Sequence, residues 1–357
     1  MNVLLILFLL FVPFYLHLWL IAAKQQNLEP SSSKSPISVI IPFRNEINNL
    51  ESLKYCIDRL ELISGDEIIL VDDQSNDQGV NLLIDLRSEC RLVSIPPGNS
   101  GSKKEALRLG ISLAQNDWIL TTDADCKMSS RWIRTWRTEI NSKRDFIVGK
   151  IALTSSSNSI LELFISCEHL ALQALTKASI NRKVPMMCSG ANLMFRKSIW
   201  EATGAYSSHL NIASGDDVLF MKDVSKHGGR IAFANGNGTL VTTYSAATIS
   251  SWLQQRLRWM SKSSHIDTIN SRFHSILLLI WLFVFPAGLS YFGWIYLLLI
   301  ISECLVLRMT SPIQPKISNY LFWPFFRVLY PIMILFLFAA SFFVKLKWKD
   351  RAIASEA

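Results

Sequence analysis

The residue pattern with the clearest chemical potential is Asp123-Ala124-Asp125, which follows the apolar run Trp118–Thr122. Mg²⁺ and Mn²⁺ prefer oxygen ligands, and Mg²⁺ is commonly held by one or two carboxylates together with substrate phosphates. Two carboxylates that are separated by a single residue, at the end of a buried strand, therefore suit a divalent cation that carries a phosphate. A solvated turn has the same composition, so the surrounding elements must decide between these two interpretations.

The elements around this pair alternate between strands and helices. Short apolar runs predict buried strands at Ile37–Pro42, Glu67–Val71, Arg91–Ile95 and Trp118–Thr122. The segments between them predict helices at residues 49–62, 80–88 and 103–114. This alternation indicates an α/β fold with an open, mostly parallel sheet and flanking helices.

Three polar clusters follow the strands of this predicted sheet, namely Arg44–Glu46, Asp72–Asp73 and Asp123–Asp125. In open α/β sheets, ligands bind outside the carboxyl ends of the strands. Because these clusters meet at that edge, they favour a ligand site over a solvated turn.

The N-terminal region is strongly apolar. Residues 3–23 are almost uninterrupted hydrophobic residues, about the length needed to cross a bilayer. No basic residue precedes this run, whereas Lys24 follows it, which favours an uncleaved anchor over a signal peptide. The positive-inside rule then places the next domain in the cytoplasm. We therefore expect a transmembrane anchor over residues 1–23 and a linker over residues 24–36.

Two further apolar regions lie near the C-terminus. Residues 275–307 fit one long span or a hairpin, and residues 320–344 fit another span. Residues 345–357 are expected to form a basic cytoplasmic tail. Two or three C-terminal spans therefore remain possible. Basic residues that flank spans favour anionic headgroups and account for the net charge of +8. No nucleic-acid-binding motif is present, so we expect a membrane partner and no nucleic acid.

With these elements in place, the chain resembles the family 2 glycosyltransferases, which have the Rossmann-like GT-A fold and bind nucleotide sugars. The motifs that carry this resemblance are Ser38–Pro42, Val71–Asp77, Lys103–Leu107, Asp123–Asp125, Ser189–Asn192, Gly215–Asp217 and Gln255–Trp259. The resemblance covers roughly residues 36–260 and implies a GT-A domain over residues 37–274, with an interfacial helix near 250–262. The membrane segments resemble the subset that modifies lipids or builds polysaccharides.

The resemblance implies a nucleotide-sugar site built from the first polar clusters. Asp73 matches the family residue that hydrogen-bonds the base, and a carboxylate suits the imide N–H of uracil. Pro42, Arg44 and Glu46 would line the nucleotide pocket, and Lys103 matches a lysine of the donor site that can neutralise the diphosphate. A uridine nucleotide sugar is therefore the expected donor.

The resemblance also implies a metal ligand and a general base. Asp125 would bind Mg²⁺ or Mn²⁺ directly, and Asp123 would lie near the ribose and the metal shell. Asp217 matches the family's general base, which takes a proton from the acceptor hydroxyl. Family members commonly have Glu-Asp here, whereas this chain has Asp216-Asp217, which keeps the base position.

Gln255-Arg256-Leu257-Arg258-Trp259 matches the family's Gln-x-x-Arg-Trp motif. By the resemblance, Gln255, Arg258 and Trp259 border the acceptor channel and contact the donor diphosphate. An amphipathic interfacial helix has a similar composition, and a site beside a membrane is compatible with both interpretations. The segment Ser189–Asn192 is expected to form part of the floor under the sugar or the acceptor.

The sequence therefore predicts an integral membrane enzyme, an inverting glycosyltransferase of the hexosyltransferase type, with its catalytic domain on the cytoplasmic side of the cell inner membrane. The expected acceptor is a lipid or a membrane-proximal glycan. A processive polysaccharide synthase is an alternative, although such enzymes usually have more spans. A non-catalytic nucleotide-binding membrane partner is a second alternative, against which the presence of both Asp125 and Asp217 argues.

Overall fold

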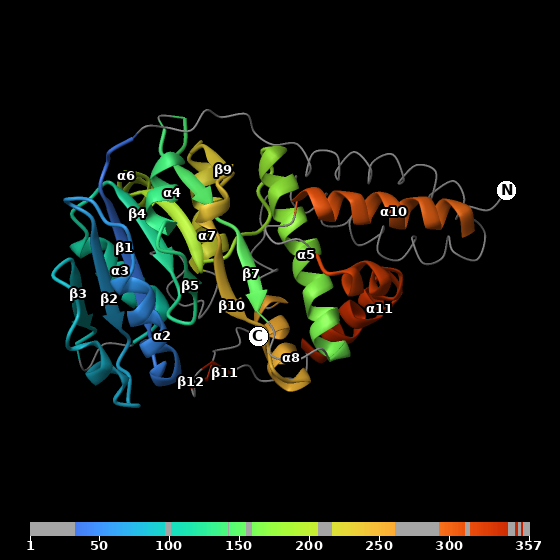
Figure 1. The fold of residues 1–357 in the computed structure, drawn as a ribbon, viewed down its shortest axis with the longest axis horizontal. Coiled ribbons are helices and arrows are strands. Elements are labelled where there is room, and N and C mark those ends of the chain that lie inside the picture. The colour runs from blue at the N-terminus through green and yellow to red at the C-terminus, as the bar shows by residue number, and fades with distance from the viewer. Residues whose placement is uncertain are drawn as a thin grey trace.

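A seven-stranded sheet forms the centre of the molecule in the computed structural model, and its strand order is β3-β2-β1-β4-β8-β6-β9 (Figure 1). The strands are β1 (Ile37–Phe43), β2 (Glu67–Asp72), β3 (Cys90–Ser94), β4 (Trp118–Thr122), β6 (Phe146–Val148), β8 (Asn192–Arg196) and β9 (Ile231–Phe233). Only β8 runs antiparallel to its neighbours in this sheet. The prediction of a mostly parallel sheet is therefore confirmed. The structure describes residues 33–96, 101–141, 143–154, 159–205, 216–260, 293–310, 315–341, 347–348 and 351–352.

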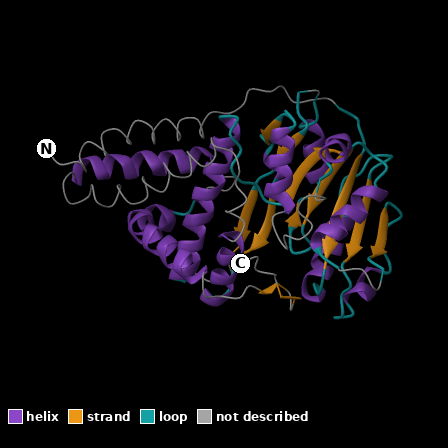
Figure 2. Ribbon diagram, turned by 180° about the vertical axis from the view of Figure 1, so that it is seen from behind, coloured by secondary structure: helices purple, strands orange, loops and turns teal. Residues whose placement is uncertain are grey.

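Helices cover both faces of this sheet, as Figure 2 shows from behind. On one face, α2 (Ile47–Asp58) and α4 (Trp132–Thr138) share a core with the side chains of Val39 and Ile41 in β1. On the other face, α3 (Lys103–Leu113) and α7 (Asp216–Lys226) share a second core with Ile40. The β-branched runs are buried because alternate side chains of each strand enter opposite cores. The short helix α6 (Lys197–Thr203) packs against this second core through Ile199 and Trp200.

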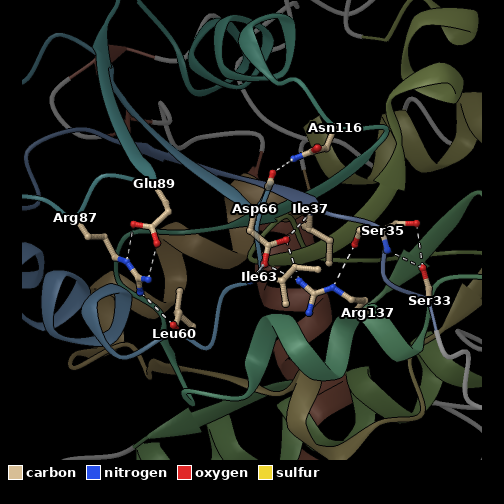
Figure 3. Close-up of polar contacts among 11 residues, drawn as sticks. Ser33, Ser35, Ile37, Leu60, Ile63, Asp66, Arg87, Glu89, Asn116 and Arg137 are labelled. Carbon is tan, nitrogen blue, oxygen red and sulfur yellow. Dashed lines mark hydrogen bonds and ion pairs between the residues drawn. The ribbon is translucent and has the colours of Figure 1, made fainter.

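The segment between β2 and β3 corrects one prediction. A helix was expected over residues 80–88, whereas the structure has a 3-10 helix, η1, at Gly79–Leu83. The rest of the segment is held by Arg87, whose Nη1 donates to the Leu60 carbonyl at 3.1 Å and whose Nη2 pairs with Glu89 at 2.9 Å (Figure 3). A bond to the chain after α2 and a local ion pair therefore hold the part of this segment that follows η1.

A smaller sheet lies beside the large one, with the order β5-β10-β7. Its strands are β5 (Lys127–Met128), β7 (Ile151–Thr154) and β10 (Val241–Tyr244), and the 3-10 helix η3 (Asn237–Thr239) leads into β10. Since β5 begins two residues after Asp125, this sheet carries the chain away from the end of β4.

Four helices pack together beyond the small sheet. They are α5 (Ile160–Asn181), α8 (Ile249–Met260), α10 (Gly293–Thr310) and α11 (Ile317–Ser341). Their shared core is rich in aromatic side chains, with Phe164 centred 5.9 Å from Trp252 and 5.1 Å from Phe326. The same core therefore joins α5 to both α8 and α11.

Among the described residues, α11 is the one helix that is long and apolar enough to cross a membrane, over Ile317–Ala340. It corresponds to the span expected at residues 320–344. The expected anchor at residues 1–23 and residues 275–292 of the other expected span lie outside the described residues, and α10 covers the remainder of that span. In the expected tail, β11 (Lys347–Trp348) pairs with β12 (Arg351–Ala352).

A buried ion pair joins α10 to α11. The Nε atom of Arg327 lies 3.3 Å from Oε1 of Glu303, and the side chains are 6% and 0% exposed. The indole N–H of Trp323 donates to the other carboxylate oxygen of Glu303. This carboxylate therefore has a cation and a neutral donor, both from α11.

A second buried ion pair lies at the amino edge of the large sheet (Figure 3). Nη2 of Arg137 lies 2.9 and 2.6 Å from the two carboxylate oxygens of Asp66, whose side chain is 0% exposed. The same carboxylate accepts the backbone N–H groups of Ile37 at 2.9 Å and Ile63 at 2.8 Å. It therefore ties α4 to the start of β1 and to the chain before β2.

Replacing Arg137 with leucine is expected to lower the free energy of unfolding by about 3–5 kcal/mol, because the Asp66 carboxylate stays buried without its cation. Urea unfolding in detergent would measure this change. The matched control is Arg134→Leu on the same helix, since Arg134 is 69% exposed in its pair with Glu61 and should cost at most about 1 kcal/mol. Equal losses in the two variants would contradict the prediction.

Candidate active site

The carboxyl end of β4 carries a cluster of charged side chains. Asp123 and Asp125 follow the strand directly, and Nζ of Lys103 lies 2.6 Å from Oδ1 of Asp123. Lys103 is the first residue of α3, whose N-cap Ser102 accepts the backbone N–H of Glu105 at 3.2 Å. The cap fixes where α3 begins, and the helix start therefore delivers the lysine to the end of β4.

Asp125 is the most strongly perturbed carboxyl group of this cluster. Burial raises its pKa, and the negative charges of Asp123 and Glu46 raise it further, whereas Lys103 lowers it. Its Oδ2 accepts the hydroxyl of Thr243 in β10 at 3.2 Å. The ionised carboxylate of Asp125 is therefore half-buried beside two other negative charges, and a bound cation would stabilise it.

These residues fit the expected divalent cation. Within the described residues, no three His, Cys, Asp or Glu side chains form a preformed metal site. Sites that hold Mg²⁺ together with a diphosphate need only one or two protein carboxylates. Lys103 already neutralises Asp123, so Asp125 is the carboxylate left with excess negative charge. The donor set therefore favours Asp125 as the direct ligand.

Asp217 lies in the first turn of α7 and is bonded to the segment that leads into β8, the strand next to β4. Its Oδ2 accepts the backbone N–H of Gly190 at 2.9 Å, and its Oδ1 accepts that of Val218 at 2.7 Å. The Gly190 carbonyl in turn accepts the hydroxyl of Thr121 in β4 at 3.1 Å. The structure therefore connects Asp217, the Ser189–Asn192 segment and the end of β4.

The loops after β1 and β2 are bonded to each other. Nη1 of Arg44 donates to the carbonyls of Asp73 at 2.6 Å and Gln74 at 2.8 Å, and Ser75 accepts the N–H of Asn45 at 3.0 Å. Asn45 and Gln74 both have positive φ angles, 50° and 56°, which asparagine tolerates better than most residues. The expected nucleotide loop therefore has a specific, locally unusual backbone.

The expected nucleotide residues differ in their access to solvent. Arg44 and Glu46 are half-buried and Pro42 is buried in β1. Asp73 is only 1% exposed, so a base can reach its carboxylate only if neighbouring side chains move. Contact between Asp73 and a base stays a prediction.

The Gln-x-x-Arg-Trp motif lies on α8, which begins five residues after β10. Gln255 and Arg258 are half-buried, and Trp259 is 42% exposed. The middle residue Arg256 is the buried one, at 6% exposure, and pairs with Glu168 of α5. The helix that carries the motif is therefore attached to α5 through Arg256, which occupies the first of the two variable positions of Gln-x-x-Arg-Trp.

Two contacts of the site were missed by the sequence interpretation. Thr243 lies 118 residues after Asp125, and Arg256 lies 88 residues after Glu168. Thr243 carries no sequence signal, since threonine is common in strands. Arg256 carried a weak one, because an arginine between tryptophans at positions 252 and 259 indicates a shared helix face.

His169 is a further partly buried residue beside the site. Its Nε2 lies 2.9 Å from the Ile151 carbonyl at the start of β7. A carbonyl only accepts hydrogen bonds, so Nε2 carries the proton of the neutral ring. Burial lowers the pKa of His169 below its ordinary value of 6.5, and the charge of Arg256 lowers it further.

His169→Gln is therefore expected to flatten the dependence of stability on pH below about 6.5. In the wild type, the unfolded chain binds a proton there that the folded protein does not, so stability falls as pH falls, by at most about 1.4 kcal/mol per pH unit. Thermal unfolding across this pH range would measure the slope. The control is His227→Gln at an exposed position, and identical slopes for wild type and His169→Gln would refute the prediction.

Comparison with known proteins agrees with this architecture. Residues 38–203 match the family model of glycosyl transferase family 2. The chain is 25% identical over 246 residues to the probable glycosyltransferase YdaM of Bacillus subtilis, covering 64% of this chain and 56% of that protein. It is 34% identical over 93 residues to the undecaprenyl-phosphate 4-deoxy-4-formamido-L-arabinose transferase of an Enterobacter species, covering 25% of this chain and 28% of that protein. The chain thus spans about half or less of these curated relatives.

Among solved structures, the fold is similar to the mannosyltransferase PcManGT of Pyrobaculum calidifontis in complex with GDP-Man and Mn²⁺. The TM-score is 0.59 at 14% identity, and the alignment covers 94% of this chain and 96% of that one. At this identity the likeness concerns the fold alone. Taken with the sheet order, the chain has a mixed α/β, GT-A-like fold, within which residues 38–203 match the glycosyl transferase family 2 model.

Proposed function

We propose that this protein is an inverting glycosyltransferase that moves a sugar from a uridine nucleotide sugar to a lipid or membrane-proximal glycan. The acceptor hydroxyl attacks the anomeric carbon directly, and the bond between that carbon and the diphosphate oxygen breaks. The configuration at the anomeric carbon is thereby inverted. No nucleophile of the protein is required.

Asp217 is the proposed general base, and it takes the proton that the acceptor hydroxyl loses. The N–H groups of Gly190 and Val218 hold one lone pair of each carboxylate oxygen, which fixes the group without protonating it. Each oxygen keeps a further lone pair for the acceptor. This geometry supports a role as a positioned acceptor of protons.

The donor is proposed to bind along the carboxyl edge, with its diphosphate between Asp125 and Lys103. Mg²⁺ or Mn²⁺ held by Asp125 and adjoining Asp123 would stabilise the charge on the departing diphosphate. Lys103 contributes a further positive charge to the same place. The loop of Pro42, Arg44 and Glu46 contacts the nucleotide in this proposal, and Asp73 bonds the base.

The proposed membrane location is supported by the outer faces of α10 and α11. Apolar side chains on α10 are exposed at intervals of four residues, and those on α11 from Ile317 to Ile332 at intervals of three or four, as one face of a helix requires. The exposed apolar residues of these two helices include Leu297, Ile301, Leu305, Met309, Ile317, Leu321, Phe325, Leu329, Ile332, Leu335, Phe336 and Phe338. So large an apolar surface marks an interaction site in soluble proteins, and a bilayer would cover it.

The observation that carries the proposed function is the cluster of Asp125, Asp123 and Lys103 at the end of β4, to which strand Asp217 is linked through Gly190 and Thr121. The test is to assay the purified, detergent-solubilised full chain against a panel of nucleotide sugars, with lipid acceptors, Mn²⁺ or a chelator. We expect release of the nucleoside diphosphate, dependent on the metal and fastest with a uridine donor.

The products of this assay discriminate between the alternatives. A single sugar added with inverted configuration agrees with the proposal, whereas long polymers would replace it with the processive synthase. Full turnover in the presence of chelator would overturn the metal assignment. Absence of turnover with every donor and acceptor would overturn the proposed activity.

A further inference from the structure

Glu168 of α5 lies at the centre of a buried cluster of hydrogen bonds that joins α5 to the motif helix α8. Its Oε1 accepts Nε of Arg256 at 2.8 Å, and its Oε2 accepts Nη2 of Arg256 at 2.6 Å. The indole N–H of Trp252 also donates to Oε2, at 3.0 Å. Glu168 is 1% exposed and Arg256 is 6% exposed. Two parallel hydrogen bonds between a carboxylate and a guanidinium add both energy and geometric specificity to the ion pair.

Arg256 is also enclosed by the rings of its own helix. Its guanidinium carbon lies 5.6 Å from the centre of the Trp252 ring and 4.2 Å from that of Trp259. These three residues are spaced by four and three positions, so they share one face of α8. The cation therefore holds the Trp259 side chain of the motif by contact with its ring face.

Each of the three guanidinium nitrogens of Arg256 donates to a protein group. Nε and Nη2 donate to Glu168, and Nη1 donates to Oε1 of Gln255 at 2.6 Å. A guanidinium has only donors, so the amide oxygen of Gln255 must face it. The NH₂ group of Gln255 is thereby turned away from Arg256 and is the part of the amide presented to another group.

We propose that Glu168 is a positioning residue for the nucleotide-sugar site. By fixing Arg256, it sets the amide of Gln255 with its NH₂ group outward and holds the ring of Trp259. Gln255 then offers N–H donors to an oxygen of the nucleotide sugar. This inference rests on the proposed function, since it takes α8 to border the donor.

Glu168→Gln is expected to raise KM for the nucleotide sugar about tenfold, which corresponds to about 1.4 kcal/mol, while kcat changes less. Glutamine keeps the volume of the side chain but cannot form the charged fork. Gln255→Ala should raise KM by a similar factor. The two changes together should be clearly less than additive, because both remove the same contact to the donor.

A structural role for Glu168 is separated from a positioning role by the double variant Glu168→Gln/Arg256→Met. It removes the buried unpaired cation, so the melting temperature should recover toward that of the wild type. KM should nevertheless stay raised, because nothing then orients Gln255. Asp66→Asn is the matched control: it breaks a buried ion pair at the opposite edge of the sheet and should lower the melting temperature without changing KM.

In the kinetic and melting experiments, the inference would be overturned by an unchanged KM in Glu168→Gln, or by recovery of both KM and melting temperature in the double variant. Failure of the proposed function would look different, as absence of turnover in the wild type. The affinity of the wild type and Glu168→Gln for uridine diphosphate with Mn²⁺, measured by calorimetry, then decides the inference separately. Equal affinities, or no binding by either protein, would reject it.

Discussion

Asp217→Asn is expected to lower kcat for glycosyl transfer by about 10²- to 10⁴-fold, the usual contribution of a positioned general base. Asparagine has no site that can accept a proton near neutral pH. Its oxygen can still accept one of the two N–H groups that Asp217 now accepts, from Gly190 or Val218. The start of α7 should therefore persist, and the loss should come from chemistry.

Single-turnover rates at saturating donor and acceptor would measure this effect, with nucleotide affinity recorded in parallel. Affinity should stay within a few-fold of the wild type, since Asp217 acts on the acceptor. Asp58→Asn, at an exposed position on α2, is the control for replacing a helical aspartate. Activity above about a tenth of the wild type in Asp217→Asn would remove Asp217 from the role of base.

The second large effect is expected at Asp125, where one substitution should change stability in two opposite ways. Without metal, Asp125→Asn should be as stable as the wild type or more stable. Burial and the charges of Asp123 and Glu46 raise the pKa of Asp125. Ionisation of Asp125 therefore opposes folding. The protonated carboxyl group favours the folded state at a pH below its pKa in the unfolded chain, and this stabilisation is lost as the pH rises through its pKa in the folded protein. A neutral amide removes this penalty.

With Mn²⁺ and uridine diphosphate, the order should reverse. The wild type should gain about 2.7 kcal/mol at a ligand concentration of 100 times Kd, whereas Asp125→Asn should gain little. Melting curves with and without Mn²⁺ would measure both effects, and a chelator should return the wild type to its metal-free value. If the variant gains as much from metal as the wild type, Asp125 is not the ligand. Turnover of the variant should fall about 10²-fold or more, in line with loss of metal-assisted charge stabilisation.

The large sheet and the carboxylate pair could be predicted from the sequence because their signals are local. The run Trp118–Thr122 is observed as β4 with the predicted bounds, since five consecutive buried positions leave little choice but a central strand. The helix starting at Lys103 was likewise predicted, because its N-cap and apolar spacing lie within a few residues of each other. The position of Asp123 and Asp125 at the sheet edge follows from these bounds.

Other parts depend on contacts that a local pattern does not encode. The helix predicted over residues 80–88 is observed only as the short 3-10 helix η1. Arg87 lies outside this helix and bonds to the chain after α2. The fork between Glu168 and Arg256 joins residues 88 positions apart, and its existence depends on how α8 packs on α5. Roles within the site, such as base or metal ligand, rest on resemblance and stay predictions.

The ion pair between Glu303 and Arg327 has a consequence for how the chain would be inserted during synthesis. In the proposed membrane location, a charged side chain within an apolar helix costs about 2.5–3.5 kcal/mol when the helix enters alone. The two charges are 0% and 6% exposed because each helix hides the charge of the other. The expected span that ends in α10 should therefore be stable in a bilayer only together with α11, and a chain truncated before residue 317 would leave the Glu303 carboxylate without its cation.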